Sequence, residues 1–180
     1  MRFRTATACD SDTVATLHAD SWRRHYRGAY SDSFLDGDVL ADRRAVWGRR
    51  LAGRAGTLTL IAEDDTGTAG FVHVVFDDDA RWGSLVDNLH VANDRRRTGI
   101  GRALLTRAAD AVSSRGPGAA PMYLWVLEQN IAAQRFYTAM GGTVADRGLV
   151  RLPGGDPSRL RGRPHKLRIT WPDAAALTAS

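Results

Sequence analysis

The chain has one cysteine, little lysine and no long apolar run. Its single cysteine, Cys9, cannot form an internal disulfide, which excludes a disulfide-stabilised secreted domain and favours a reducing cytoplasm. No stretch of about 18 apolar residues and no charged-then-apolar leader occurs, so the sequence predicts neither a membrane span nor a signal peptide. The histidines show no ligand spacing with cysteine or with a carboxylate cluster, so no metal site is expected.

Arginine supplies all but one of the 25 basic side chains, the exception being Lys166, and the formal net charge is +5. This excess would attract a phosphate-bearing cofactor, an acidic substrate or nucleic acid, and charge alone does not choose among them. Basic residues gather late in the chain, where the simplest interpretation is a solvated loop and strand face and the alternative is a polyanion-binding patch. They are Arg151, Arg159, Arg161, Arg163, Lys166 and Arg168.

The length of 180 residues suits one domain around one core. We expect residues 1–172 to form that domain and residues 173–180 to be a frayed tail. Strand-like and helical periodicities alternate along the chain. The expected strands cover 3–6, 57–62, 69–76, 84–91, 123–127, 143–150 and 167–171, and the expected helices cover 11–24, 33–51 with Gly37 as a candidate break, 99–114 and 130–140.

The segment from Val91 to Leu105 is the most informative one. An arginine cluster there leads through Gly99-Ile100-Gly101 into a helical pattern. Glycines let the backbone approach a ligand closely, and the first turn of a helix offers unpaired N–H groups and the positive end of its dipole to an anion. The segment therefore predicts a phosphate cradle.

Two common phosphate loops are excluded by single positions. A dinucleotide fingerprint needs a third glycine where Leu104 stands. A P-loop needs Gly-Lys-Ser/Thr, whereas the only lysine is Lys166. The pattern that remains is Arg-x-x-Gly-x-Gly, from Arg96 to Gly101.

A second motif follows the apolar strand at 123–127. It is an amphipathic helix with asparagine, alanine, phenylalanine and tyrosine at fixed spacing, closed by glycine. Its residues are Asn130, Ala133, Phe136, Tyr137 and Gly141. Together with the arginine-glycine loop, this helix resembles the coenzyme A-binding motifs of the GNAT superfamily of N-acetyltransferases over roughly residues 83–142. One position departs from the family pattern, because Gly142 stands where the family usually has phenylalanine.

The resemblance implies an α+β fold, with a mixed, mostly antiparallel sheet of about seven strands, four flanking helices and parallel, splayed central strands 4 and 5. It also implies acetyl-CoA as the cofactor, with the pyrophosphate on the loop amides and the pantetheine arm along the preceding strand. The N–H of Leu89 would stabilise the oxyanion, and Asn130 would hydrogen-bond the arm as well as cap its helix. The implied cofactor-binding residues are Leu89, His90, Val91, Arg96, Arg97, Thr98, Gly99, Ile100, Gly101, Arg102, Asn130 and Tyr137.

Catalysis requires an acid for the departing thiolate and a base for the incoming amine. By the resemblance Tyr137 is the acid, since a phenol pKa near 10 lies above a thiol pKa near 8.5, and the alternative is a core aromatic. Asp87 is the candidate base because it lies two residues before Leu89, hence on the same strand face. Glu128 and a water relay are its competitors. His90, on the opposite face, is expected to be structural.

In the family that the chain resembles, the first two helices and the last strands determine which acceptor is bound. Residues 21–28 resemble a Ser-Trp-x-x-x-Tyr-x-Gly signature of many small acetyltransferases. The candidate acceptor-binding residues are Trp22, Tyr26, Tyr30 and Asp87, with His25, Phe34, Trp47, Trp82 and Trp171 as further aromatic neighbours that would otherwise be core.

Two hypotheses follow. The leading one is an acetyl-CoA-dependent N-acetyltransferase that acts on a primary amine of a small molecule, protein or peptide by direct attack in a ternary complex. It would work in the cytoplasm as a monomer or homodimer, with neither a membrane nor nucleic acid as partner. The alternative is a catalytically weak coenzyme A-binding module that binds nucleic acid or another polyanion through the late arginines. The presence of Asn130 and Tyr137 favours the enzyme.

Overall fold

A seven-stranded sheet with helices on both faces forms the frame of the protein in the computed structural model, which describes residues 1–53 and 55–177. The strands are β1 (Arg2–Thr5), β2 (Thr57–Asp64), β3 (Gly67–Asp79), β4 (Gly83–Val91), β5 (Met122–Leu127), β6 (Thr143–Leu149) and β7 (His165–Trp171). The α-helices are α1 (Ser11–His25), α2 (Asp32–Asp36), α3 (Val39–Ala52), α4 (Ile100–Ser113) and α5 (Ile131–Ala139). The helix expected over 33–51 is divided at Gly37 into α2 and α3, which makes five helices where four were expected.

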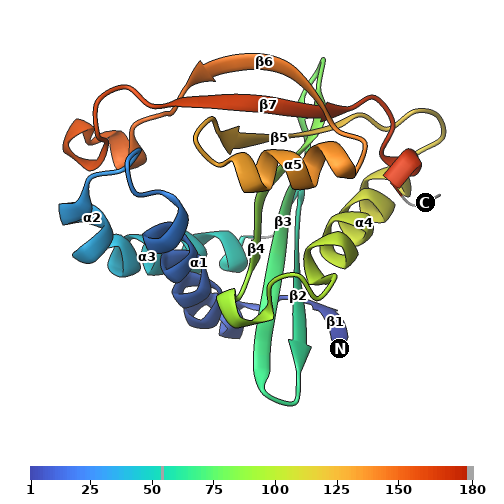
Figure 1. Cartoon of the computed structure of the whole chain (residues 1–180). Coiled ribbons are helices and arrows are strands. Elements are labelled where there is room, and N and C mark those ends of the chain that lie inside the picture. The colour runs from blue at the N-terminus through green and yellow to red at the C-terminus, as the bar shows by residue number, and fades with distance from the viewer. Residues whose placement is uncertain (54, 178–180) are drawn as a thin grey trace.

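The sheet is mixed and splits in its middle. Its order is β1-β2-β3-β4-β5-β7-β6, and the neighbours β4 and β5 are parallel while the other pairs are antiparallel. The parallel pairing joins only Ser84–Val86 to Met122–Leu124. Beyond it the strands diverge, so that β5, β7 and β6 cross above the long strands β2 to β4 (Figure 1). This is the expected α+β architecture with parallel, splayed central strands.

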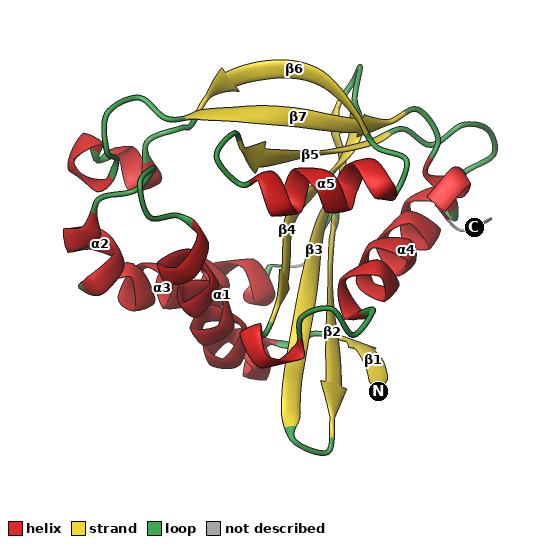
Figure 2. Cartoon of the chain, viewed as in Figure 1, coloured by secondary structure: helices red, strands yellow, loops and turns green. Residues whose placement is uncertain are grey.

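Different helices cover the two faces of the long strands. Trp47 of α3 makes edge contacts with Phe71 and His73, whereas Val72 and Val74 share a core with Leu104 of α4. Because side chains alternate along a strand, α1 and α3 lie on one face and α4 on the other, as Figure 2 shows. No helix within residues 1–53 and 55–177 is long and apolar enough to cross a membrane.

A β-bulge interrupts β4 where the sheet splits. His73 of β3 pairs with Asn88 and Val74 pairs with Val86, which leaves Asp87 without a partner on β3. The side chain of Asp87 reaches Arg50 of α3, with 2.6 Å between Oδ2 and Nη2, while Leu89 packs against the core on the α4 side. The expectation that Asp87 and Leu89 share a face is therefore wrong, because the extra residue shifts the alternation.

A tryptophan fills the space beside Gly142, the position that departs from the family pattern. A Cβ atom at Gly142 would lie 2.5 Å from Ile169 and 2.7 Å from the indole of Trp171. The indole Nε1 donates a hydrogen bond of 2.9 Å to the carbonyl oxygen of Met140 at the end of α5. Packing after α5 is thus supplied from β7, and Trp171 is a core residue.

The C-terminal segment is more ordered than expected. Residues 174–177, expected in a frayed tail, form the short 3-10 helix η5 (Ala174–Leu177). Ala174 and Leu177 are buried in the core that includes α4, because they cover apolar surface there. The remaining residues of the expected tail, 178–180, lie outside the described residues.

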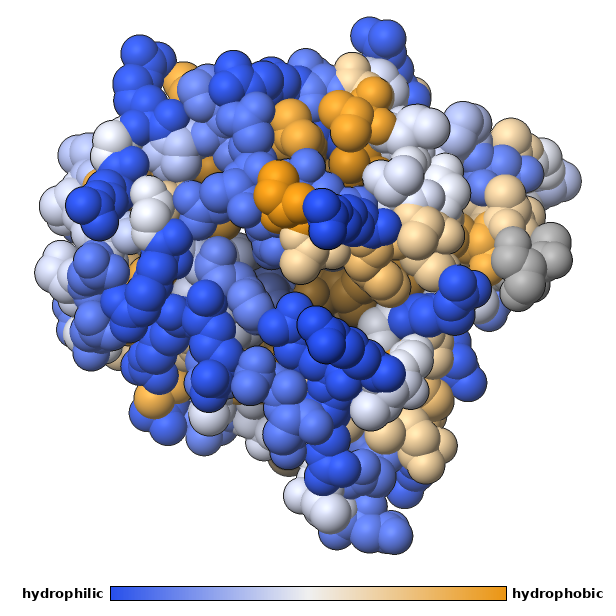
Figure 3. All heavy atoms as spheres, in the orientation of Figure 1, coloured by the Kyte–Doolittle hydropathy of each residue, from blue (hydrophilic) through white to orange (hydrophobic). Residues whose placement is uncertain are grey.

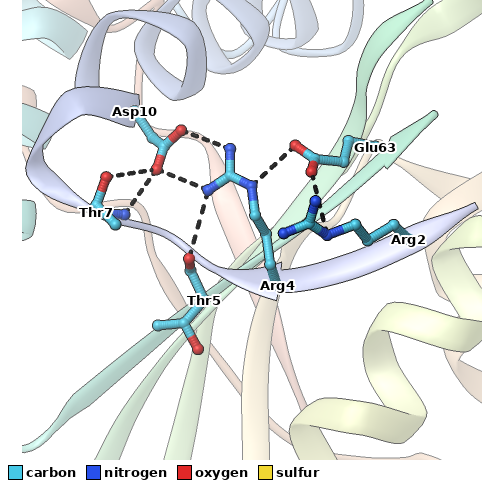
Figure 4. A network of polar contacts seen from close by, with 6 residues as sticks. All are labelled: Arg2, Arg4, Thr5, Thr7, Asp10 and Glu63. Atoms are coloured by element: carbon cyan, nitrogen blue, oxygen red, sulfur yellow. Dashed lines mark hydrogen bonds and ion pairs between the residues drawn. The ribbon is translucent and has the colours of Figure 1, made fainter. Parts of the chain in front are cut away.

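A charged network ties β1 to its neighbours (Figure 4). The guanidinium of Arg4 donates to both oxygens of Asp10, at 2.7 and 2.9 Å, and to Glu63 of β2 at 2.9 Å. Asp10 also accepts the backbone N–H of Thr7 at 2.7 Å, which completes a capping box on the 3-10 helix η1 (Ala8–Asp10). Hydrogen bonds from Arg4 hold the pKa of Asp10 well below its usual range.

We expect Asp10→Asn to lower the free energy of unfolding by about 1–2 kcal/mol at neutral pH, because it breaks a charge-assisted, partly buried pair. The wild-type stabilisation is complete above the pKa of a free aspartate, about 3.9, and is lost as the pH falls through the lower folded pKa. Urea unfolding should therefore show the difference shrinking below about pH 4. Asp20→Asn, which breaks an exposed pair with Arg24, is the control and should cost less than about 0.5 kcal/mol. Equal losses in the two variants would contradict this role of Asp10.

Candidate active site

A cavity of about 530 Å³ lies where β4 and β5 diverge. Its walls come from the end of α1, from β4, from the loop before α4, and from β5 and α5. Figure 3 shows this face, with hydrophilic side chains gathered toward α1 and the loop, and hydrophobic ones toward α4 and α5. Every sequence-predicted cofactor residue but one lines the cavity, namely Leu89, His90, Val91, Arg96, Arg97, Gly99, Ile100, Gly101, Arg102, Asn130 and Tyr137. The exception is Thr98, whose hydroxyl donates to the carbonyl of Arg95 at 2.7 Å.

The loop before α4 is shaped to leave helix N–H groups open. Arg97 and Gly99 both adopt left-handed backbone conformations, with φ of 64° and 85°. Gly99 is the N-cap of α4 and provides no side-chain hydrogen bond, so the first N–H groups of the helix lack a capping partner. Ile100 and Gly101 lie in the cavity wall, so this helix N-terminus, where N–H groups and the helix dipole favour an anion, faces the cavity.

One arginine of the loop before α4 forms an ion pair, whereas its neighbours do not. Arg95 pairs with Asp64 at 3.4 Å and donates to Thr66, which ties the loop to the turn between β2 and β3. Within the described chain, Arg96, Arg97 and Arg102 make no ion pair. Their charges are available to a phosphate-bearing ligand at the cavity mouth.

The edge of β4 is open on the cavity side. Leu89 pairs with Val72 of β3, but beyond Val86 no residue of β4 pairs with β5 in the described sheet. Peptide groups on such an edge can hydrogen-bond an extended ligand as a further strand would.

Tyr137 brings a phenol to the cavity wall. Its ring packs against Phe136 and Trp171, with centroid separations of 5.2 and 6.3 Å. Burial, with a smaller effect of Tyr26, raises the pKa of Tyr137 well above its usual value of 10. The hydroxyl makes no hydrogen bond to another described residue, so it is a neutral and unengaged donor. Asn130 caps α5 by accepting the N–H of Ala133 at 3.2 Å, as expected.

The two candidate carboxylate bases lie in different places. Asp87 lines the main cavity and carries the ion pair with Arg50. Glu128 lines a separate cavity of about 270 Å³ and is held by two hydrogen bonds of 2.8 Å from Arg147, which lower its pKa. Asp87 is therefore the better placed of the two.

Buried histidines join α1 to the sheet beneath the cavity. The Nδ1 of His90 lies 2.8 Å from the hydroxyl of Ser21, and its ring lies 4.5 Å from that of His18. Trp47 donates its indole N–H to Nδ1 of His18 at 2.9 Å, so a neutral His18 carries its proton on Nε2. Burial lowers the pKa of His18 well below its usual value and that of His90 to about 3. The expectation that His90 faces away from Asp87 is wrong, because the bulge places both side chains on the α1 and α3 side of the sheet, while Leu89 faces the α4 side.

Tyr26 alone of the candidate acceptor aromatics Trp22, Tyr26 and Tyr30 lines the cavity. Trp22 and Tyr30 are 8% and 6% exposed and form a core cluster with Phe34, because α1, α2 and the segment between them bury their rings against one another. Burial and the charge of Asp87 raise the pKa of Tyr26 to about 12.

Sequence reasoning missed Trp125, which also lines the cavity. Its segment, Met122–Leu127, is uniformly apolar and resembles a strand buried on both faces. One face of it becomes free only because β5 diverges from β4.

The late basic residues do not form a single patch. Arg159 pairs with Asp42 of α3 at 2.6 Å, whereas Arg168 packs on the ring of Trp125 at 4.6 Å. Arg161 comes only within 3.9 Å of Asp32. The described residues contain no group of three or more histidine, cysteine and acidic side chains that could hold a metal ion.

Comparison with known proteins points to one family. The family model described as Acetyltransferase (GNAT) family matches residues 19–141. An uncharacterised N-acetyltransferase of Bacillus subtilis (strain 168), YuaI, is 27% identical over 180 residues, which cover 97% of this chain and 94% of the relative. The probable N-acetyltransferase Rv2775 of Mycobacterium tuberculosis is 30% identical over 143 residues, or 76% of each chain.

A solved structure shows the same fold with a ligand. The PaiA N-acetyltransferase of Thermoplasma acidophilum, in complex with coenzyme A, aligns with a TM-score of 0.70 and 20% identity. The alignment covers 94% of this chain and 98% of the other.

The buried histidines should make the protein sensitive to acid. His73, whose Nδ1 lies 2.8 Å from the hydroxyl of Thr59, has its pKa lowered to about 4, chiefly by burial. An unfolded histidine titrates near 6.5, so the unfolded state binds more protons and stability falls as the pH drops from about 6.5 to 4. For each such histidine the slope is up to about 1.4 kcal/mol per pH unit. We expect the free energy of unfolding of His73→Gln, measured with urea, to fall less steeply than that of wild type as the pH drops from 7.5 to 4.5. Equal pH dependence of the two proteins would refute this account.

Proposed function

The chain belongs to the acetyltransferase (GNAT) family, and on this premise we propose that it transfers the acetyl group of acetyl-CoA to a primary amine by direct attack within a ternary complex. The observation that carries the proposal is one cavity lined by an uncapped helix N-terminus, unpaired arginines and a neutral phenol. The acceptor is the amine of a small molecule or of a protein or peptide. We propose that the chain acts as one catalytic domain, which includes residues 174–177, in the cytoplasm, where the exposed thiol of Cys9 would stay reduced.

The cofactor site is proposed to have two parts. The open N–H groups of α4, with Arg96, Arg97 and Arg102, hold the pyrophosphate, since backbone donors and free guanidinium groups together neutralise its charge. The free edge of β4 at Leu89 aligns the pantetheine arm and offers an N–H to the carbonyl oxygen of the thioester. Acetyl-CoA supplies an activated acyl group.

Tyr137 acts as the general acid in this proposal. Its raised pKa keeps the phenol protonated at neutral pH, where it can donate to the departing sulfur. Packing against Phe136 and Trp171 holds the ring at the cavity wall.

Asp87 holds the incoming ammonium group and takes its proton. It is the carboxylate in the cavity wall, and the bulge in β4 directs it toward the side of α1 and α3. Arg50 occupies one of its oxygens, so the amine approaches the other oxygen or exchanges with the guanidinium.

The most direct test is release of free thiol from acetyl-CoA with a panel of amines, peptides and aminoglycosides. An enzyme gives acceptor-dependent thiol release. A binding module would instead bind coenzyme A without turnover and bind RNA or DNA with a steep salt dependence.

We expect Tyr137→Phe to lower kcat about 100-fold with the dissociation constant of coenzyme A unchanged, because only the proton donor is removed. Steady-state kinetics and calorimetry measure the two effects. Tyr123→Phe is the matched control, since that hydroxyl donates to Asp78 outside the cavity. Unchanged turnover of Tyr137→Phe at every pH would rule out the acid role.

Replacement of Gly99 should weaken cofactor binding specifically. Gly99 and Gly56 both have positive φ, 85° and 69°, and a Cβ atom added at either position would meet no atom within 4 Å. Alanine at either site should therefore cost a similar amount of stability, about 1 kcal/mol. Only Gly99→Ala should reduce the affinity for coenzyme A, by about 10-fold or more, because its Cβ enters the phosphate cradle. Equal affinities of the two variants by calorimetry would reject the cradle.

A further inference from the structure

Two cations lie on the face of Trp125, beside the active-site cavity. The Nζ of Lys166 is 4.1 Å from the ring centroid, and the Cζ of Arg168 is 4.6 Å from it. The register of β5 and β7 sets Arg168 opposite Trp125 and Lys166 opposite Leu127, so these side chains share one face of the sheet. Trp125 and Leu127 both line the cavity, and Lys166 and Arg168 of β7 contact the ring of Trp125 without themselves being part of the cavity wall.

The positive charge at this face is poorly compensated. Among the described residues, Lys166 and Arg151 pair with no carboxylate. Arg168 meets Asp146 only at 3.6 Å, and its buried Nε has no hydrogen-bond partner. Burial, followed by the charges of Arg151 and Arg168, lowers the pKa of Lys166. Like charges crowded in a partly buried place cost free energy, and a bound anion would offset that cost.

The nearest negative charge in the cavity wall is that of Asp87 on β4. Asp87 is within electrostatic reach of Lys166, where it partly opposes the lowering of the lysine pKa. Arg50 already pairs with Asp87, so this carboxylate does not neutralise Lys166 as well. The region thus offers one acidic position near Tyr26, in the wall of the cavity that also holds Tyr137, and a basic position around Trp125.

We infer that the acceptor is zwitterionic, with its amine at Asp87 and an anionic oxygen group, such as a carboxylate, at Lys166 and Arg168. This inference rests on the proposed acetyl transfer and names its substrate class. A molecule with only positive groups, such as a polyamine, is disfavoured by the same cations. Lys166, the one lysine in a chain that otherwise uses arginine, is the specificity-determining residue.

The test compares ω-amino acids of increasing length with their matched primary amides as acceptors for thiol release. We expect kcat/KM to be at least about 10-fold higher for the acid than for its amide at the length that spans the two positions. O-phosphoethanolamine against ethanolamine tests a phosphate in place of the carboxylate, and a preference there supports the same subsite.

Substitutions at Lys166 test whether this side chain causes the preference for acids over amides. Lys166→Met keeps the apolar stem over Trp125 and should lose the preference for the acid through a higher KM for the acid. Lys166→Arg should keep the preference. Arg44→Met removes the same charge from an exposed pair with Asp12 and is the control that should behave as wild type. A preference retained in Lys166→Met would overturn the assignment.

Binding provides a readout that does not need turnover. In the presence of coenzyme A, the N-acetyl derivatives of the same amino acids should bind wild type more tightly than their amides in calorimetry, and Lys166→Met should abolish the difference. If no acid binds more tightly, or if amides and polyamines are acetylated as well as acids, the zwitterionic acceptor is refuted while acetyl transfer stands. Failure of coenzyme A itself to bind would refute the proposed function instead.

Discussion

The rest of the site depends on the short parallel contact between β4 and β5. Three residue pairs, Ser84–Val86 with Met122–Leu124, hold the two halves of the sheet together before they separate. If the pairing continued, the backbone edge at Leu89 would be satisfied by β5 and the cavity would close. Because it stops, peptide groups of β4, the helix α5 with Tyr137, and the face of Trp125 all reach the same space.

The bulge at Asp87 lies at the same point and has a separate consequence. An extra residue in β4 moves Asp87 toward α3, while Leu89 keeps its contact with the core around α4. The carboxylate of Asp87 and the side chain of Leu89 therefore lie on different faces of β4. Below them, neutral histidines fix α1 against β4, since His90 contacts both Ser21 and His18.

Basic side chains without an acidic partner indicate where this protein could bind an anion. Many arginines are neutralised locally, as Arg4 is by Asp10 and Glu63, and these contribute to the frame. Arg96, Arg97 and Arg102 at the start of α4 and in the loop before it, and Lys166 at Trp125, lack such partners in the described chain. Net charge did not distinguish the two groups, whereas the positions of the acidic side chains do.

The sequence by itself determined the order of the main strands and helices, the glycine turn before α4 and the family. Gly99 with a helical pattern after it, and Asn130 with Tyr137 at fixed spacing, are local features, and local geometry needs only neighbouring residues to be predicted. Tertiary structure decided where the remaining candidate residues lie: Trp22 and Tyr30 are core, Asp87 sits on a bulge, and Trp125 lines the cavity. Those properties depend on strand divergence and on which layers meet, and contacts between distant segments leave no periodic signal in the chain.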